Sequence, residues 1–211
     1  MMLDDPFAVN SLVERLGRAL DPVEGPPPAP VRGDGDLNGA PSPTGRVLRP
    51  AAVLAPLVVR ETGLSVVFTR RADHLSAHAG QISFPGGRLN AGEDPAEAAL
   101  RESEEEIGLP RSRVRLIGRF DPYETVTGFQ ITPFVGLVDS AAELRADPGE
   151  VAEIFETPFD FLMNPANHVL EERMFGGQLR RYYAMPHEGR YIWGATAGLL
   201  KALADRFNAF R

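Results

Sequence analysis

The chain has 211 residues, of which 43% are hydrophobic and 24% are charged, a composition typical of a soluble globular protein with one or two domains. It contains no cysteine, which excludes disulfide bonds, thiolate catalysis and zinc sites built on cysteine. The formal net charge of −7 disfavours nucleic acid as a partner. The sequence has neither a long apolar run nor an apolar signal core behind its acidic N-terminus, so we expect a cytoplasmic protein without a membrane partner.

The first fifty residues change abruptly in composition. Residues 6–20 place apolar side chains at the spacing of one helix face, with Asp5 as a helix cap. A stretch rich in proline and glycine follows. We therefore predict an N-terminal helix within residues 1–21, a linker or long surface loop over residues 22–46, and the main domain over residues 47–211.

The main domain is predicted to mix strands and helices. Apolar runs indicate strands, the first two and the last two paired as hairpins, over residues 52–60, 64–70, 81–84, 114–120, 130–138, 168–175 and 178–185. Helical spacing indicates helices over residues 95–107 and 157–163 and a C-terminal helix marked by apolar side chains from Ile192 to Phe207. We expect Pro85-Gly86-Gly87 to end the third strand. Because strands and helices do not alternate regularly, the pattern favours an α+β fold over a doubly wound one.

The predicted helix over residues 95–107 has the clearest local signals in the chain. Asp94 is a good N-cap and Pro95 suits the first helical position, while Glu97 is placed to complete a capping box. Gly108 fits the left-handed residue that ends a helix. One face of the helix can pack inward through Ala96, Ala99, Leu100, Ser103 and Ile107.

Carboxylates crowd the C-terminal end of this helix, at Glu102, Glu104, Glu105 and Glu106. Like charges three and four residues apart repel by about 0.2–0.5 kcal/mol per pair, and the helix dipole disfavours anions at this end. Glu102, Glu105 and Glu106 share a face, where a divalent cation would convert repulsion into ligation. Hard carboxylate oxygens select Mg²⁺ or Mn²⁺ over Zn²⁺. The alternative is an acidic face that is simply solvated.

The residues around this cluster have a fixed spacing, given by Gly87, Glu93, Arg101, Glu102, Glu105, Glu106, Gly108 and Leu109. Together they match the Nudix box over residues 87–109, with one departure at Ser103, where an aliphatic residue is usual. The chain is therefore similar to the Nudix hydrolase family. The resemblance implies a Nudix-type α/β/α sandwich with a mixed β-sheet, and metal-assisted hydrolysis of a diphosphate linked to another group.

The resemblance also implies roles for the carboxylates. Glu102 and Glu106 are the expected metal ligands, joined by the backbone carbonyl of Gly86. Glu105 is a further ligand or the base that activates water, so Glu105 and Glu102 are the expected catalytic residues. Because family members differ in their base, three downstream carboxylates stay open as candidates, although a surface position is the expected one for each: Glu124, Glu150 and Glu153.

A second motif precedes the box, formed by Thr69, Arg71, Ala72 and Gly80 followed by Phe84-Pro85-Gly86-Gly87. It resembles the signature of the coenzyme A pyrophosphatase branch of the Nudix family, which also tends to carry a small polar residue at the position of Ser103. Ser76 departs from it, because the branch usually has arginine there. The resemblance implies hydrolysis of coenzyme A or a derivative to 3′,5′-ADP and 4′-phosphopantetheine or its acyl form, with Mg²⁺ or Mn²⁺ as cofactor.

The arginines near the box are expected to have two roles, binding of the substrate's phosphates and support of the box. Arg71, with Arg70 or Arg88, can bind phosphates through charge-assisted hydrogen bonds, and a solvated strand end is the alternative for each. Glu93 and Arg101 are expected to form an ion pair that ties the loop to the helix. Phosphate binding is the alternative for Arg101.

Other residues and functions are weighed against this interpretation. His74 and His78 lie four residues apart, but the loop around them argues against a metal pair. Trp193 and the Tyr182-Tyr183 pair can stack on adenine, although packing is the commoner role of large aromatics. Two rival functions stay open: Nudix hydrolysis of ADP-ribose, a dinucleotide or a nucleoside triphosphate, which Ser76 favours, and nucleotide binding without cleavage, which the intact carboxylates disfavour. A small molecule is the expected partner, and the oligomeric state is left open.

Overall fold

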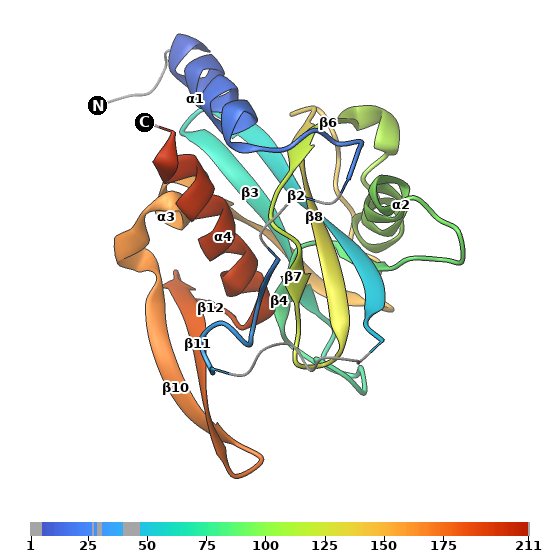
Figure 1. Ribbon diagram of the computed structural model, residues 1–211. Helices are drawn as coiled ribbons and strands as arrows, with labels where there is room; N and C mark the ends of the chain where they lie inside the picture. The colour runs from blue at the N-terminus through green and yellow to red at the C-terminus, as the bar shows by residue number, and fades with distance from the viewer. Residues whose placement is uncertain (1–5, 27, 29–30, 40–46, 211) are drawn as a thin grey trace.

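The computed structural model describes residues 6–26, 28, 31–39 and 47–210 and contains two β-sheets with helices around them (Figure 1). The larger sheet has nine strands: β1 (Arg32–Gly33), β2 (Arg49–Arg60), β3 (Gly63–Arg71), β4 (Ile82–Ser83), β5 (Gly86–Arg88), β6 (Val114–Arg119), β7 (Tyr123–Glu124), β8 (Phe129–Val138) and β9 (Val151–Pro158). The smaller sheet has three: β10 (Val169–Phe175), β11 (Gln178–His187) and β12 (Arg190–Trp193). The α-helices of the described residues are α1 (Pro6–Ala19), α2 (Pro95–Ile107), α3 (Phe159–Met163) and α4 (Ala195–Ala209).

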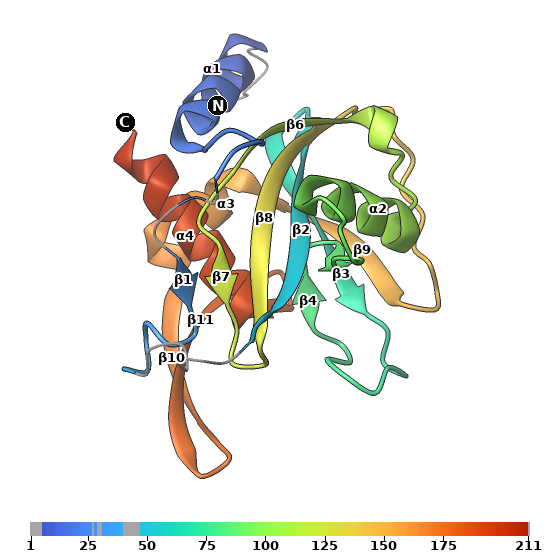
Figure 2. The same ribbon diagram turned by 45° about the vertical axis from the view of Figure 1, so that its right-hand side comes forward.

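The centre of the large sheet is β2, which pairs parallel with β8 on one side and antiparallel with β3 on the other. Its side chains alternate, so that Leu54 and Val58 join the core under α2, whereas Ala55 and Leu57 join the core on the opposite face. α2 covers one face of the sheet, and α1, α3 and α4 lie on the other (Figure 2). The predicted α+β fold, a Nudix-type α/β/α sandwich with a mixed sheet, is confirmed.

Several predicted elements are confirmed in position. β2 and β3 form the first hairpin, and β10 and β11 form the second, which turns at Gly176-Gly177 with positive φ at both residues. α2 begins at Pro95 and ends at Ile107, as its caps indicate. Strands β6 and β8 occupy the predicted regions.

Four local details differ from the predictions. The third strand, β4, ends before Pro85 as expected, but Gly86 and Gly87 then form a strand of their own, β5, with Arg88; β5 pairs with residues 51–53 of β2, because glycine allows close backbone approach as well as turns. Thr157 and Pro158 belong to β9, and α3 begins only at Phe159. Ile192 lies in β12, separated from α4 by Gly194 at φ 64°. β9 itself was not expected, because glutamates interrupt its apolar pattern. Glu156 pairs with Arg60 of β2, and Glu153 lies 3.7 Å from Arg70 of β3.

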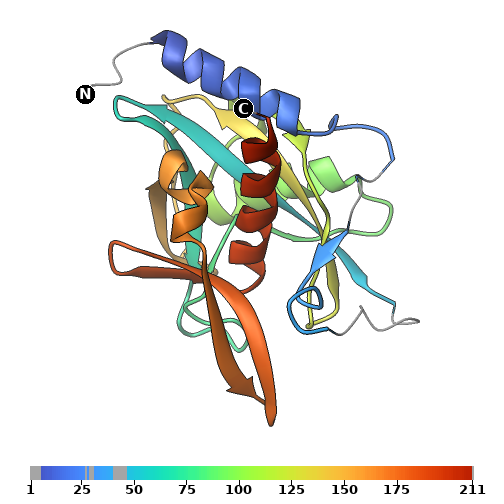
Figure 3. The same ribbon diagram turned by 60° about the vertical axis from the view of Figure 1, so that its left-hand side comes forward.

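The predicted N-terminal helix is present as α1 and lies near the C-terminal end of α4 (Figure 3). Leu16 is fully buried, and Arg15 Nη2 donates a hydrogen bond of 2.9 Å to the carbonyl of Phe207. The expected cap, Asp5, lies outside the described residues. None of the described helices is long and apolar enough to cross a membrane.

The described part of the proline- and glycine-rich segment lies against the domain. β1 pairs parallel with β7, and Tyr123 of β7 donates a 2.8 Å hydrogen bond to the Asp34 carboxylate. Asp121, whose side chain is only 1% exposed, receives Arg32 at 3.2 Å and Arg206 at 2.7 Å. Two arginines from opposite ends of the chain therefore compensate one buried carboxylate.

Candidate active site

The site is built on α2 and the strand that precedes it, and the helix is held by its two caps. The Asp94 carboxylate accepts hydrogen bonds from the backbone N–H groups of Ala96 at 2.8 Å and Glu97 at 3.4 Å. At the other end Gly108 adopts φ 63° and donates its N–H to the carbonyl of Glu104. The predicted capping box is wrong, because the Glu97 carboxylate instead receives Arg111 Nη1 at 2.9 Å.

The inward face of α2 differs in part from the predicted one. Ala98 and Ala99 are fully buried, whereas Leu100 is only half-buried. Ser103 is buried and its hydroxyl donates a 2.7 Å hydrogen bond to the carbonyl of Ala99, one turn earlier, so a small polar residue fits here without an unpaired group. The unexpected inward residue is Glu106.

Glu106 is a buried carboxylate at the centre of the site. Its side chain is 5% exposed, and Oε2 accepts a 3.3 Å hydrogen bond from the backbone N–H of Gly86. Arg71 Nη1 lies 3.9 Å from Oε1, longer than a hydrogen bond. Burial raises the pKa of Glu106 to about 8; the charges of Glu102 and Glu150 add to this shift, while the Gly86 N–H and Arg71 oppose it.

The glycines of β5 bring the backbone against these carboxylates. Gly86 has φ 153°, and a Cβ there would lie 2.4 Å from the carbonyl oxygen of Ala52 on β2. A Cβ on Gly87 would lie 2.5 Å from the carboxylate of Glu102. Gly86 is therefore required by the sheet, whereas Gly87 leaves room for a functional side chain.

We expect Gly87→Ala to lower activity while largely preserving the fold. The new methyl group would displace the Glu102 carboxylate, which ends a flexible side chain, whereas the backbone of β5 can stay in place. Turnover at saturating metal should fall about tenfold or more if Glu102 holds the metal as the resemblance implies, since small displacements around a metal site cost that much. Thermal unfolding and turnover measured on the same preparation would check this, and an unchanged rate would contradict it.

Arg101 uses all five of its N–H groups, and four of them bind the other carboxylates around the box. Nε and Nη2 bind the two oxygens of Glu93 at 2.7 and 3.0 Å, Nη1 binds Glu102 at 2.8 Å and Glu105 at 3.1 Å, and Nη2 also donates to the carbonyl of Arg88 at 3.1 Å. A guanidinium has five donors, and each is used here. The geometry therefore favours a supporting role for Arg101 over phosphate binding.

This network shifts the pKa values of the carboxylates in opposite directions. Hydrogen bonds from Arg101 and from the Asn90 N–H lower the pKa of Glu93 to about 2. Burial raises the pKa of Glu102 in spite of the bond from Arg101. Glu105 has a 59% exposed side chain. The carboxylates thus range from a firmly ionised support to groups that burial makes costly to ionise.

The downstream candidates separate clearly. Glu150 lies close enough to raise the pKa values of Glu102 and Glu106, because the loop before β9 is tied to α2 by a 2.9 Å hydrogen bond from the Asp147 N–H to the Glu106 carbonyl. Glu153 instead pairs with Arg190 at 2.5 Å. Glu124 lies on β7, which pairs with β1 and β8. Only Glu150 of the three lies beside the box.

The three candidate phosphate-binding arginines are also separated. Arg71 points to the α2 side of the sheet, toward Glu106, and its side chain makes no hydrogen bond within the described residues. Arg70, on the opposite side of β3, pairs with Asp73 at 2.8 Å and Glu153 at 3.7 Å. Arg88 is exposed on β5, with its guanidinium carbon 5.3 Å from the Phe129 ring centroid.

One cation beside Arg88 was not anticipated. Arg49, at the start of β2, lies 4.0 Å from the same Phe129 ring, so that two guanidinium groups meet at one aromatic side chain near the box. The sequence holds no signal for this group, because the residues lie far apart along the chain and meet only through sheet pairing between β2, β5 and β8.

The remaining sequence candidates lie elsewhere. His78 pairs with Gln81 at 2.7 Å in the exposed loop. Trp193 packs edge-on against Tyr182, with ring centroids 5.4 Å apart, and Tyr183 lies under Lys201. These contacts agree with the packing role of the aromatics.

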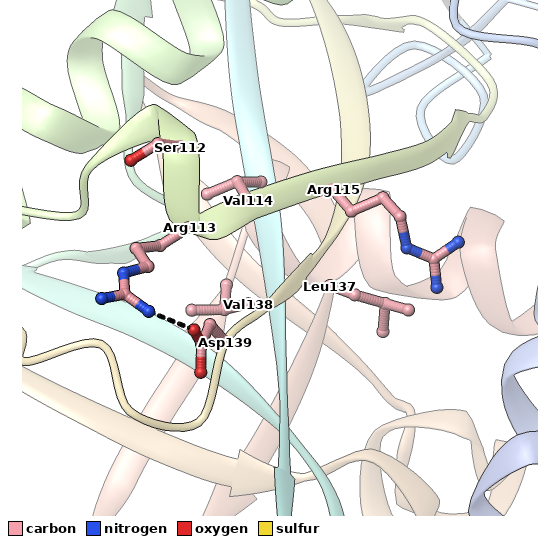
Figure 4. Close-up of a pocket in the computed structure, with 7 residues that line it drawn as sticks. All are labelled: Ser112, Arg113, Val114, Arg115, Leu137, Val138 and Asp139. Atoms are coloured by element: carbon pink, nitrogen blue, oxygen red, sulfur yellow. Dashed lines mark hydrogen bonds and ion pairs between the residues drawn. The ribbon is translucent and has the colours of Figure 1, made fainter.

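Two surface depressions lie away from the box. One has a volume of about 340 Å³ and is lined by residues 112–115 and 137–139, where Arg113 pairs with Asp139 (Figure 4). The other, of about 560 Å³, lies between α1 and β6. Neither contains a box residue, and neither gathers buried charge. We therefore place the candidate site at the carboxylates of α2. Ionisable groups with shifted pKa values indicate a functional site more directly than the volume of a surface depression does.

The comparisons with known proteins identify the family of the chain. A model of the NUDIX domain matches residues 48–175, which is more than half of the chain. The chain belongs to the Nudix family. It is 39% identical over 159 residues to the uncharacterized Nudix hydrolase NudL of Yersinia enterocolitica, covering 75% of this chain and 81% of the relative. The NudL protein of Escherichia coli K12 is 38% identical over 157 residues, covering 74% and 81%.

A solved structure shows the same fold. The MutT protein of Methanosarcina mazei Go1 matches with a TM-score of 0.50 and 15% identity, over 78% of this chain and 96% of that one. The box helix of this Nudix protein is therefore set in the architecture of the family.

Nudix hydrolases generally use divalent cations, and the box residues of this chain suit one. Within the described ranges no three acidic or histidine side chains are arranged to hold a metal ion, and Glu102 and Glu105 each direct one oxygen to Arg101. The buried Glu106 nevertheless stands among carboxylates, with Arg71 at 3.9 Å as its nearby cation. A hard divalent ion fits this donor set and would compensate its charge.

Proposed function

We propose that this chain is a divalent-metal-dependent Nudix hydrolase that cleaves the diphosphate bond of coenzyme A or a coenzyme A derivative. The products would be 3′,5′-ADP and 4′-phosphopantetheine or its acyl form. The observation that carries the proposal is the 3.9 Å approach of Arg71 to Glu106. Arg71 belongs to the motif before the box and Glu106 to the box itself, so the two motifs meet in one site.

The charges of the substrate suit the available arginines. Coenzyme A carries a diphosphate and a separate 3′-phosphate, and arginine binds phosphate with strong, directional hydrogen bonds. Arg71 makes no side-chain hydrogen bond within the described residues and has only the 3.9 Å approach to Glu106, unlike Arg101. Arg88 and Arg49, exposed beside Phe129, provide a second cationic position for the other phosphate.

The metal would be held by Glu102, Glu106 and the carbonyl of Gly86, with Glu105 as a further ligand. When bound, the ion neutralises charge on the diphosphate oxygens as water attacks phosphorus.

The chain's own residues supply the remaining functions. Arg71 binds and orients the diphosphate, and Arg101 holds the carboxylates in position. Glu105, which is exposed, or Glu150, which lies beside the box, accepts the proton of the attacking water.

A hydrolysis assay with separated products tests the proposal. Coenzyme A is incubated with Mg²⁺ or Mn²⁺, and ADP-ribose is run in parallel. We expect metal-dependent release of 3′,5′-ADP from coenzyme A. Cleavage of ADP-ribose without cleavage of coenzyme A would disprove coenzyme A as the substrate and point to Ser76 as the reason. Cleavage of neither compound would disprove the proposed reaction on both substrates.

Arg71→Ala should impair substrate binding, and Arg70→Ala is the matched control on the other face of the same strand. Because Arg71 faces Glu106 while Arg70 is engaged by Asp73 and Glu153, we expect kcat/KM to fall about 10- to 100-fold for Arg71→Ala, mostly through KM, and to stay near wild type for Arg70→Ala. Steady-state kinetics at saturating metal would measure both. Equal losses in the two variants would contradict the assignment.

A further inference from the structure

The hairpin of β10 and β11 projects from the body of the molecule and carries exposed apolar side chains (Figure 3). Phe175 is 73% and Met174 62% exposed, and Leu170 and Leu179 are each about half exposed. Scattered apolar residues are normal on a surface, but these gather on one small hairpin. The hairpin is therefore a candidate interaction surface.

The two edges of this hairpin differ in how far other described residues cover them. On the β11 edge, β12 pairs with residues 184–187. The side-chain amide of Asn38 binds the backbone of Arg181 there: Oδ1 accepts from the Arg181 N–H at 2.8 Å, and Nδ2 donates to the Arg181 carbonyl at 3.1 Å. On the β10 edge, the described residues contribute no further strand. Alternate residues of β10, those whose N–H and C=O groups point away from β11, thus offer backbone groups to a partner strand.

We propose that β10 pairs antiparallel with β10 of a second copy of this chain, about a two-fold axis at Glu172. In this register Glu171 lies opposite Arg173 of the second copy, Leu170 opposite Met174, and Val169 opposite Phe175. Every apolar residue meets an apolar residue, and each off-axis charge meets its opposite. Cross-strand pairs of these kinds are the ones that stabilise sheets.

The neighbouring registers do not share this property. Opposed residues of an antiparallel pair point to the same face, so the two-fold axis must pass through a residue and each change of register moves it by one residue. An axis at Glu171 would set Leu170 against a glutamate and Val169 against an arginine, and an axis at Arg173 would set both glutamates against Met174 and Phe175. The sequence of β10 therefore specifies one register.

The residue on the axis is also compensated. Two copies of Glu172 would face each other, but each already accepts a 2.7 Å hydrogen bond from Arg181 of its own hairpin. The centre of the interface would hold two carboxylates and two guanidinium groups. On the same face Leu179, opposite Met174 in the hairpin, extends the apolar contact to the next strand.

Charge reversal across the axis tests the proposal by sedimentation velocity over a wide range of protein concentrations. We expect the wild type to form a dimer of twice the 23.0 kDa chain mass. Glu171→Arg and Arg173→Glu should each weaken it about tenfold or more, since each opposes like charges at two symmetry-related positions. An equimolar mixture of these two variants should form a heterodimer, and the double variant with both changes should recover the homodimer.

Glu188→Arg is the matched control, because it makes the same change of charge as Glu171→Arg at an exposed position in the turn between β11 and β12, away from the β10 edge. It should leave the dimer near wild-type strength. Recovery by mixing also shows that both single variants are folded, although Glu171 binds the hydroxyls of Tyr182 and Tyr191. A monomeric wild type at every concentration, or a dimer unaffected by either reversal, would overturn the proposal.

Discussion

Replacing Glu106 with glutamine is expected to abolish hydrolysis and, at the same time, to stabilise the metal-free protein at neutral and higher pH. The activity loss should be about a hundredfold or more, because in the proposed site Glu106 is an anionic metal ligand that an amide cannot replace. The gain in stability arises because Glu106 is buried beside Glu102 and Glu150, where its ionised form is costly. Glutamine keeps an acceptor for the Gly86 N–H and adds no charge.

The sign of the pH dependence follows from the raised pKa of Glu106. Its pKa is about 8 in the folded protein and about 4.5 when unfolded, so between these values the folded state holds a proton that the unfolded state has released. The free energy of unfolding therefore falls as the pH rises from about 4.5 to 8, with an upper limit of about 5 kcal/mol, because one pKa unit is worth about 1.4 kcal/mol. Glu106→Gln removes this contribution. The free energy of unfolding of the variant should therefore equal that of the wild type at pH 4 and exceed it most above pH 8.

Urea unfolding in the presence of a chelator, repeated from pH 4 to 8.5, would measure this difference. Glu104→Gln is the control, because Glu104 is exposed on the same helix and pairs with Arg111. It should change neither activity nor the pH profile. Added Mg²⁺ should stabilise the wild type but not Glu106→Gln, since only a state that binds the ion gains from it. Wild-type turnover by Glu106→Gln would disprove the ligand assignment, and parallel pH profiles would disprove the cost of burial.

The features of this site that could be predicted from the sequence are those formed by residues close together along the chain. α2 has caps and apolar spacing that lie within the helix or next to it, and the predicted bounds agree with the structure. The pairing of Glu93 with Arg101 also appears as expected, at 2.7 Å. Both features depend on residues that are close along the chain.

The burial of Glu106 depends on distant parts of the chain, so it could not be predicted from the apolar spacing of the helix alone. The carboxylate is covered because β5 approaches it through Gly86 and because the loop before β9 is bonded to its backbone through Asp147. The same loop brings Glu150 beside the site; its position in the sequence predicted a surface carboxylate, and it is exposed as well as close to Glu106. Contacts between distant segments decide both outcomes.

The separation of Arg70 from Arg71 could have been predicted. Neighbouring residues of a strand point to opposite faces, so a strand ending in two arginines can present only one of them to the helix above it. Since Thr69 and Arg71 share a face with Val67, which packs in the core under α2, the alternation assigns Arg71 and not Arg70 to the side of the box. The strand period carried information that the motif alone did not.

Arg101→Ala is expected to lower kcat/KM about 10- to 100-fold and to destabilise the fold, in both cases through the carboxylates that Arg101 holds. Without the guanidinium, Glu93 loses two hydrogen bonds, and Glu102 and Glu105 lose the one cation bonded to both within the described residues. Arg101→Lys should be intermediate, because an ammonium group cannot bind both oxygens of Glu93 in a fork and still reach the Arg88 carbonyl.

The dependence of the Arg101 variants on metal concentration distinguishes support from phosphate binding. If Arg101 positions the ligands, its loss weakens metal binding, so raising Mg²⁺ should recover much of the rate while KM for the substrate changes little. If Arg101 instead binds phosphate, KM should rise and excess metal should not restore it. The five occupied donors favour the first result. Arg111→Ala, which removes only the exposed pairs with Glu97 and Glu104, should leave the metal dependence unchanged, since exposed pairs contribute little.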